Sequence, residues 1–169
     1  MSLLALLHVA CLVFLAALLL AAGAQDLRTM HIANGFSIAI VGLFAVSTGV
    51  DFAVGTGSLA NLGFSIGCAV VVFGIGAAAF ALGALGGGDV KFLAAVSLFA
   101  GPAQIVNFLA ITSIAGGLLG IAILAGVPIG RPVAATAGPS LRARLKTDLP
   151  YGPAIAAGGL WVAASLALT

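Results

Sequence analysis

Two aspartates beside long apolar segments are the residues of this sequence best suited to do chemistry. Asp89 follows three glycines in the stretch Gly86–Lys91, and Asp26 lies in a short polar stretch after the first apolar run. An ionisable residue against a membrane span is energetically expensive, which indicates a functional site. Two carboxyl groups in a low-dielectric site share one proton, so one can activate a water molecule while the other protonates the leaving amide nitrogen. We therefore predict that Asp26 and Asp89 form the catalytic pair of an aspartic endopeptidase.

The sequence offers little support for other catalytic chemistries. It has no H-E-x-x-H motif and no cluster of histidines, and its two cysteines, Cys11 and Cys68, lie far apart within apolar runs. No serine or cysteine nucleophile stands near a histidine in a recognisable motif. We therefore expect neither a metal nor a cofactor.

The composition indicates a membrane protein. Of the 169 residues, 63% are hydrophobic and 6% are charged, whereas a soluble domain carries about a quarter charged residues. A net charge of +2 is too small to indicate nucleic-acid binding. The expected partners are the lipid bilayer and a protein substrate, and residues 1–169 are expected to form a single membrane-embedded peptidase domain.

Apolar runs separated by polar connectors predict an all-α, polytopic membrane helix bundle with about six transmembrane helices. The first run has no basic segment before it and is longer than the apolar part of a usual signal peptide, so we interpret it as a retained span. The fourth run is short and ends at Gly101-Pro102. The predicted spans cover approximately residues 2–24, 32–50, 63–85, 89–103, 105–127 and 151–168.

The basic residues predict how these spans are oriented. All of them fall in the first, third and fifth connectors, which the positive-inside rule makes cytoplasmic, with both termini outside. This orientation places Asp26 and Asp89 at the cytoplasmic face of the cytoplasmic membrane and Asp51 at the opposite face. Asp148, in the fifth connector, is interpreted as a counter-charge. The basic residues are Arg28, Lys91, Arg131, Arg142, Arg144 and Lys146.

Residues around the two aspartates are expected to support them. Gly86 and Gly88 can adopt backbone angles closed to other residues and leave room for an extended peptide beside Asp89, although they also suit a simple turn. Arg28 and Lys91 can stabilise the ionised carboxylate or orient the substrate carbonyl, and a role as topology anchors is equally compatible with their positions.

Three other interpretations of the same residues stay open. Asp26 with Arg28, and Asp89 with Lys91, could be interfacial charges that mark the ends of spans. The carboxylates could instead serve a small proton-coupled transporter. The chain could also be a non-catalytic assembly subunit of a pilus or secretion apparatus. Replacing either aspartate by asparagine discriminates between these possibilities, because an assembly subunit should tolerate the change.

Two motifs resemble those of the type IV prepilin peptidases, which are membrane-embedded aspartyl proteases. The stretch Gly86-Gly87-Gly88-Asp89-Val90-Lys91 is similar to the family motif G-x-G-D-x-K. The stretch from Asp26 to Asn34 is similar to the other motif, an aspartate followed by arginine and then Ile-Pro-Asn, with Ala33 in place of the proline. The segment Pro150-Tyr151-Gly152-Pro153 before the last span also resembles the family.

The resemblance implies a specific activity. Family members remove the short basic leader of prepilins on the cytoplasmic side of the hydrophobic stem, and Asp26 and Asp89 match their catalytic pair. Asn34 belongs to the matching motif. Larger members also methylate the new N-terminus through a segment with C-x-x-C pairs, whereas the first connector here has only about seven residues. The chain resembles the compact members of Flp/Tad-type pilus systems, which implies cleavage without methylation.

Overall fold

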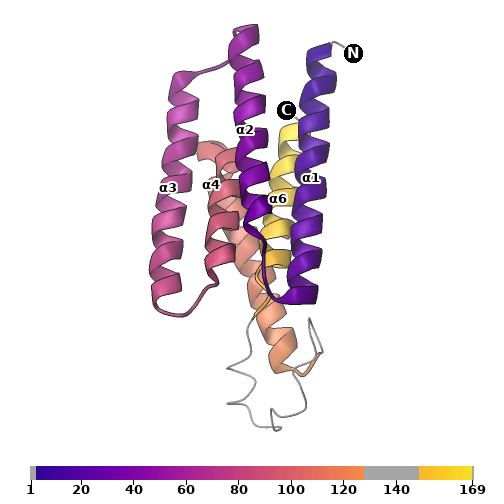
Figure 1. The fold of residues 1–169 in the computed structure, drawn as a ribbon, viewed down its shortest axis with the longest axis vertical. Helices are drawn as coiled ribbons and strands as arrows, with labels where there is room; N and C mark the ends of the chain where they lie inside the picture. The colour runs from indigo at the N-terminus through magenta and orange to yellow at the C-terminus, as the bar shows by residue number, and fades with distance from the viewer. Residues whose placement is uncertain (1–2, 128–148, 169) are drawn as a thin grey trace.

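The computed structural model describes residues 3–127 and 149–168, and this part of the chain forms a bundle of α-helices (Figure 1). No β-strand occurs in these two ranges, so the prediction of an all-α fold is confirmed. The helices are α1 (Leu3–Thr29), α2 (Asn34–Val54), α3 (Leu59–Ala81), α4 (Gly87–Leu124) and α6 (Gly152–Ala167).

Four of these helices, α1 to α4, are long and apolar enough to cross a membrane, and α6 is a shorter apolar helix. Large hydrophobic side chains cover much of the outer surface, among them Phe64, Ile75 and Leu118. Such a surface is unfavourable in water and suits contact with lipid. The chain is therefore a helical membrane protein, while the predicted count of six spans stays a prediction.

Helix α4 is broken at Gly101, which separates a first arm (residues 87–100) from a second arm (residues 102–124). Gly101 has φ 52° and ψ −169°, and Pro102 follows it without a main-chain N–H. Figure 1 shows that the second arm runs back toward the end of the bundle where the first arm began. At 1.5 Å per residue the first arm is about 21 Å long, which is shorter than the ~30 Å hydrocarbon core of a bilayer.

The arrangement of the chain ends matches an even number of passes through the bundle. The start of α1 and the end of α6 lie at the same end in Figure 1, while the α1–α2 and α3–α4 connections lie at the other. The side of the membrane on which each end lies is a prediction from the basic residues. Arg131, Arg142, Arg144, Lys146 and Asp148 fall outside the described residues.

Helices α1 and α4 extend further into the polar connectors beside Asp26 and Asp89 than the sequence predicted. Helix α1 continues to Thr29, whose hydroxyl donates to the carbonyl of Gln25 at 3.0 Å, so Asp26 lies inside the helix. Helix α4 starts at Gly87, which places Asp89 in its first turn. Hydropathy shows where an apolar segment ends, whereas a helix ends where its main-chain hydrogen bonds end. In α1 and α4 the helix continues beyond the apolar segment.

The core lies between α1, α4 and α6, where Leu19, Phe92 and Phe108 are fully buried. Glycines on α6 allow the helices to approach closely. A Cβ atom on Gly159 would lie 2.8 Å from Leu19 Cδ2, and one on Gly158 would lie 2.8 Å from the carbonyl oxygen of Phe108. Small residues promote such packing in membranes, where no hydrophobic driving force acts between helices.

Candidate active site

Asp26 is a buried carboxylate, 3% exposed, near the C-terminal end of α1. Its Oδ2 accepts a hydrogen bond of 2.7 Å from the main-chain N–H of Gly152, at the start of α6. The N-terminus of a helix carries partial positive charge and unpaired N–H groups, so it stabilises a carboxylate. A Cβ atom on residue 152 would lie 2.6 Å from Asp26 Cβ, and for this reason only glycine fits there.

Asp89 lies in the first turn of α4 and is partly buried. Its Oδ2 accepts a hydrogen bond of 3.2 Å from the main-chain N–H of Gly86, the residue that precedes the helix. This is the carboxylate half of a capping box, in which an acidic side chain reaches back to the start of its own helix. Asp89 therefore has a structural role in starting α4, whatever chemistry it performs.

The structure brings these two carboxylates together from positions far apart in the chain. They lie within electrostatic range of each other, and their charges repel. The connection between α1 and α2 passes directly against the start of α4. A Cβ atom on Gly88 would lie only 2.9 Å from the carbonyl oxygen of Ile32 in that connection. Close contact between these two backbones places the end of α1 beside the first turn of α4.

The glycines before Asp89 act through their lack of bulk, and the expectation of unusual backbone angles was wrong for Gly86 and Gly88. Gly86 has φ −74° and ψ 145°, which other residues also adopt, and the glycine with positive φ in this connection is Gly83 (φ 72°). A Cβ atom on Gly86 would lie 2.6 Å from Asp89 Oδ2. Gly86 therefore leaves space beside the carboxylate, and Gly88 leaves space for the carbonyl of Ile32.

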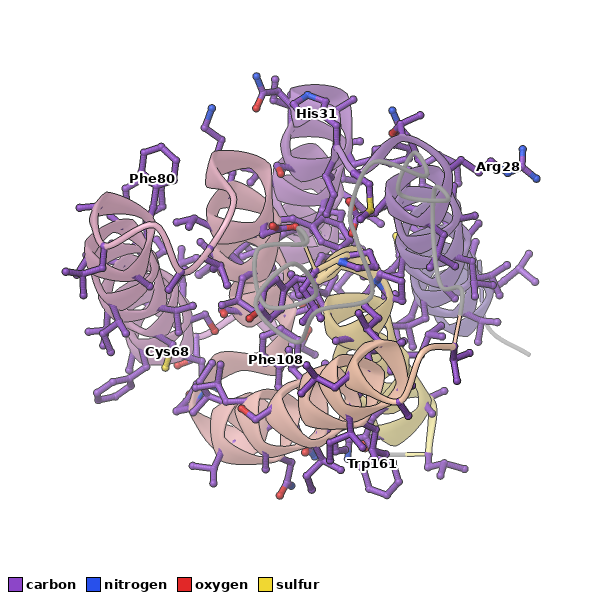
Figure 2. All side chains as sticks on the ribbon, turned by 90° about the horizontal axis from the view of Figure 1, so that it is seen from below. Arg28, His31, Cys68, Phe80, Phe108 and Trp161 are labelled. Carbon is purple, nitrogen blue, oxygen red and sulfur yellow. The ribbon has the colours of Figure 1, made fainter. Side chains whose placement is uncertain are left out.

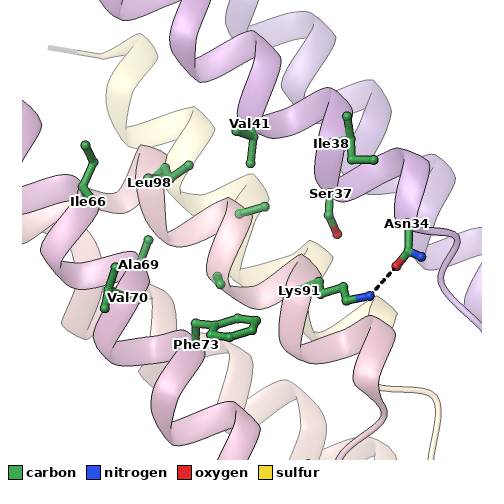
Figure 3. Close-up of a pocket in the computed structure, with 12 residues that line it drawn as sticks. Asn34, Ser37, Ile38, Val41, Ile66, Ala69, Val70, Phe73, Lys91 and Leu98 are labelled. Atoms are coloured by element: carbon green, nitrogen blue, oxygen red, sulfur yellow. Dashed lines mark hydrogen bonds between the residues drawn. The ribbon is translucent and has the colours of Figure 1, made fainter.

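Two further predicted site residues, Lys91 and Asn34, contact each other. Lys91 Nζ donates to Asn34 Oδ1 at 3.1 Å, which links α4 to the first residue of α2 (Figure 3). Ala33 precedes α2 with φ −66°, the value that a proline ring imposes, so the chain follows the path that the proline of the similar motif would set.

Arg28 and Asp51 lie elsewhere. Arg28 is exposed in the last turn of α1, and Figure 2 shows its side chain pointing away from the bundle. A direct role for Arg28 beside the carboxylates is therefore not supported by its position, and a role at the membrane surface fits it better. Asp51 lies near the C-terminal end of α2, at the opposite end of the bundle from Asp26.

The sequence did not identify two residues of this region, Gly152 and Ser37, as site residues. Gly152 donates the hydrogen bond that holds Asp26, and the glycine between Pro150 and Pro153 was the available signal. Ser37, one turn after Asn34 on α2, is buried, and its hydroxyl has no hydrogen-bond partner among the described residues. Its spacing from Asn34 was visible in the sequence, but nothing there indicated that it would be buried.

One protein-family model matches most of the chain. A sequence profile of the type IV leader peptidase family matches residues 13–121, which include both Asp26 and Asp89. No match was found among curated proteins or among solved structures. The matched region covers well over half of the chain. The chain therefore belongs to the type IV leader peptidase family.

Proposed function

We propose that this protein is an aspartyl endopeptidase of the cytoplasmic membrane that removes the leader peptide of prepilin-like substrates. In this proposal Asp26 and Asp89 are the catalytic residues, they work at the cytoplasmic face, and the new N-terminus is left unmethylated. The observation that carries the proposal is that the end of α1, with Asp26, and the start of α4, with Asp89, lie at one end of the bundle (Figure 1) and that the two carboxylates are within electrostatic range of each other. Membership of the type IV leader peptidase family supports it.

The proposed reaction needs one proton shared by the two carboxyl groups. The ionised carboxylate takes a proton from a water molecule while the water oxygen attacks the scissile carbonyl carbon, and the protonated carboxyl donates to the carbonyl oxygen. The resulting gem-diol intermediate then breaks its C–N bond as the amide nitrogen receives a proton from the pair and one hydroxyl of the gem-diol returns its proton to the pair. The products are a carboxylic acid and an amine, and the pair again holds one proton.

The hydrogen bonds to the main chain orient both carboxylates for this reaction. Gly152 N–H holds Asp26 through Oδ2, and Gly86 N–H holds Asp89 through Oδ2. The other oxygen of each carboxylate, Oδ1, has no hydrogen-bond partner among the described residues, so in this proposal it faces water or the substrate. Holding reacting groups in place before the reaction lowers the barrier. The carboxylates lose their freedom of movement when the protein folds, so this entropy is not lost again in the transition state.

The test is cleavage of a co-expressed prepilin by three single variants. Asp26→Asn and Asp89→Asn should abolish the mass shift of the pilin, whereas Asp51→Asn, at the other end of the bundle, should leave it unchanged. The mature N-terminus, read by mass spectrometry, should be unmethylated. Pilin that is still shortened by both of the first two variants would refute the catalytic pair. A transporter would show no pilin processing by the wild type, and an assembly subunit would support pili in all three variants.

A further inference from the structure

A groove beside the first arm of α4 has no role in the reaction described so far. It has a volume of about 690 Å³ and lies between α2, α3 and that arm, as Figure 3 shows. Lys91 lines one end of it, and Lys91 is two residues from Asp89 on the same helix. The groove therefore leads along the membrane toward the carboxylate pair.

The groove has a shape into which one further helix would fit. On α4 it is lined by Lys91, Ala94, Ala95 and Leu98, which follow the spacing i, i+3, i+4 and i+7 of one helix face. The lining residues of α2 (34–41) and of α3 (66–73) repeat the same spacing. Three helix faces around one groove form the arrangement into which an amphipathic or apolar helix packs. Seven residues along a helix span about 10.5 Å, or two turns.

The groove is open sideways to the lipid. Helices α2 and α3 both pack against α4 but make few contacts with each other. Apart from its polar end, the walls are apolar, with side chains such as Ile38, Val70 and Phe73. An apolar helix already in the bilayer can enter between α2 and α3 without passing through water.

The end of the groove next to the carboxylates is polar and has unused hydrogen-bonding capacity. Ser37 lines this end, is 8% exposed, and its hydroxyl has no partner among the described residues. Figure 3 shows Ser37, Asn34 and Lys91 on the same side of the groove. A buried hydroxyl without a partner is unfavourable. It indicates that a ligand with its own polar group occupies this place.

We propose that this groove binds the apolar helix of a membrane-inserted protein substrate, and that Ser37, Asn34 and Lys91 bind its main chain where that helix unwinds. The inference rests on the proposed peptidase function and adds the site that receives the substrate.

The chemistry of an unwound helix end fits these three side chains. The first four N–H groups of a helix have no partner within it, and in a membrane they must find one in protein. The hydroxyl of Ser37 and the amide oxygen of Asn34 can accept from such N–H groups, while the ammonium group of Lys91 can donate to a carbonyl. The peptide beyond the helix end is then extended and lies beside Asp89. An acyl chain would fill the apolar walls but would leave Ser37 without a partner.

The first test is photo-crosslinking from two neighbouring positions of α3. Val70 lines the groove and Val71 does not, and the two are 64% and 60% exposed. Benzoylphenylalanine is placed at either position in the full-length Asp89→Asn protein, in vesicles that contain a precursor with a short basic leader and a 20-residue apolar helix. The expected result is a precursor adduct from position 70 and none from position 71. Equal adducts from both positions, or only lipid adducts from position 70, would overturn the proposal.

The second test separates this proposal from the peptidase activity itself. Val70→Trp should raise the KM for the precursor at least about tenfold and leave cleavage of a leader peptide without the apolar helix unchanged, while Val71→Trp changes neither. If Val70→Trp cleaves the precursor with the wild-type KM, the groove is not the docking site although the peptidase stands. If the wild type cleaves nothing, the peptidase proposal fails, and the crosslinking result alone decides whether the groove binds a helix.

Discussion

The main-chain N–H of Gly152 donates a 2.7 Å hydrogen bond to the carboxylate of Asp26, across 126 positions of the sequence. This contact joins the start of the last helix to the end of the first. It also explains why residue 152 is glycine, because any Cβ there would collide with Asp26. The last helix thus belongs to the candidate active site although it carries no ionisable group of its own.

We predict that Gly152→Ala strongly impairs cleavage. Its Cβ would lie 2.6 Å from Asp26 Cβ, and a displacement of the carboxylate by about 1 Å can lower the rate about 100-fold. Overpacking should also destabilise the fold by about 1–3 kcal/mol. The measurements are pilin cleavage and thermal unfolding in detergent. Gly117→Ala is the control, since a Cβ there meets nothing within 4 Å, and wild-type cleavage by Gly152→Ala would contradict the role of this contact.

The neighbouring glycines before Asp89 should differ in their tolerance of a methyl group. In Gly88→Ala the Cβ would lie 2.9 Å from the carbonyl oxygen of Ile32, whereas in Gly87→Ala its nearest neighbour is a ring carbon of Phe80 at 3.4 Å. We expect Gly88→Ala to lose at least about 90% of the cleavage rate, because it forces the α1–α2 connection away from α4. Gly87→Ala should keep most of the rate. Equal rates for the two variants would show that the backbone contact at Gly88 does not position the carboxylates.

Asp89 has a structural role that can be separated from its proposed catalytic one. Asp89→Asn keeps an oxygen that can accept from the N–H of Gly86, whereas Asp89→Ala removes it. Both variants should be inactive toward the prepilin. Only Asp89→Ala should lose stability, by about 1 kcal/mol, as is typical for a lost helix cap. Thermal unfolding of the two proteins in the same detergent measures the difference, and equal unfolding temperatures would exclude the capping role.

Ser37→Ala should raise stability and lower activity together. The hydroxyl of Ser37 is buried and has no partner in the described part of the chain, so its removal relieves an unfavourable burial and unfolding should become harder by up to about 1 kcal/mol. If Ser37 binds the substrate main chain, kcat/KM for the precursor should fall about fivefold, the effect of one lost hydrogen bond. Ser47→Ala is the control on the same helix, because the hydroxyl of Ser47 already donates to the carbonyl of Phe44. Unchanged kcat/KM in Ser37→Ala would assign its hydroxyl to packing alone.

The fold class and the two aspartates could be predicted because their signals are local. A lipid solvent requires apolar runs and internally satisfied hydrogen bonds, which leads directly to membrane helices. The same requirement makes Asp26 and Asp89 conspicuous. Glycine and proline at positions 101 and 102 also marked correctly where α4 would break. In each case a short stretch of sequence was enough.

Contacts between distant segments were beyond the reach of such reasoning. The pairing of Lys91 with Asn34 and the burial of Ser37 depend on how α2 and α4 pack, and the outward direction of Arg28 depends on how α1 is turned within the bundle. A charged residue near the end of a span has the same kind of neighbouring sequence whether its side chain faces a carboxylate or points out of the bundle. Only the relative placement of the helices distinguishes the two.

The sequence by itself determined that this chain is a helical membrane protein with two candidate catalytic aspartates, because hydropathy and isolated charges can be read one segment at a time. The tertiary structure decided that Asp26 lies within electrostatic range of Asp89, that Gly152 holds it, and that a groove runs beside Lys91. These facts arise from backbones that approach closely at glycines and from helices that fail to meet. Both are properties of packing, which no single segment contains.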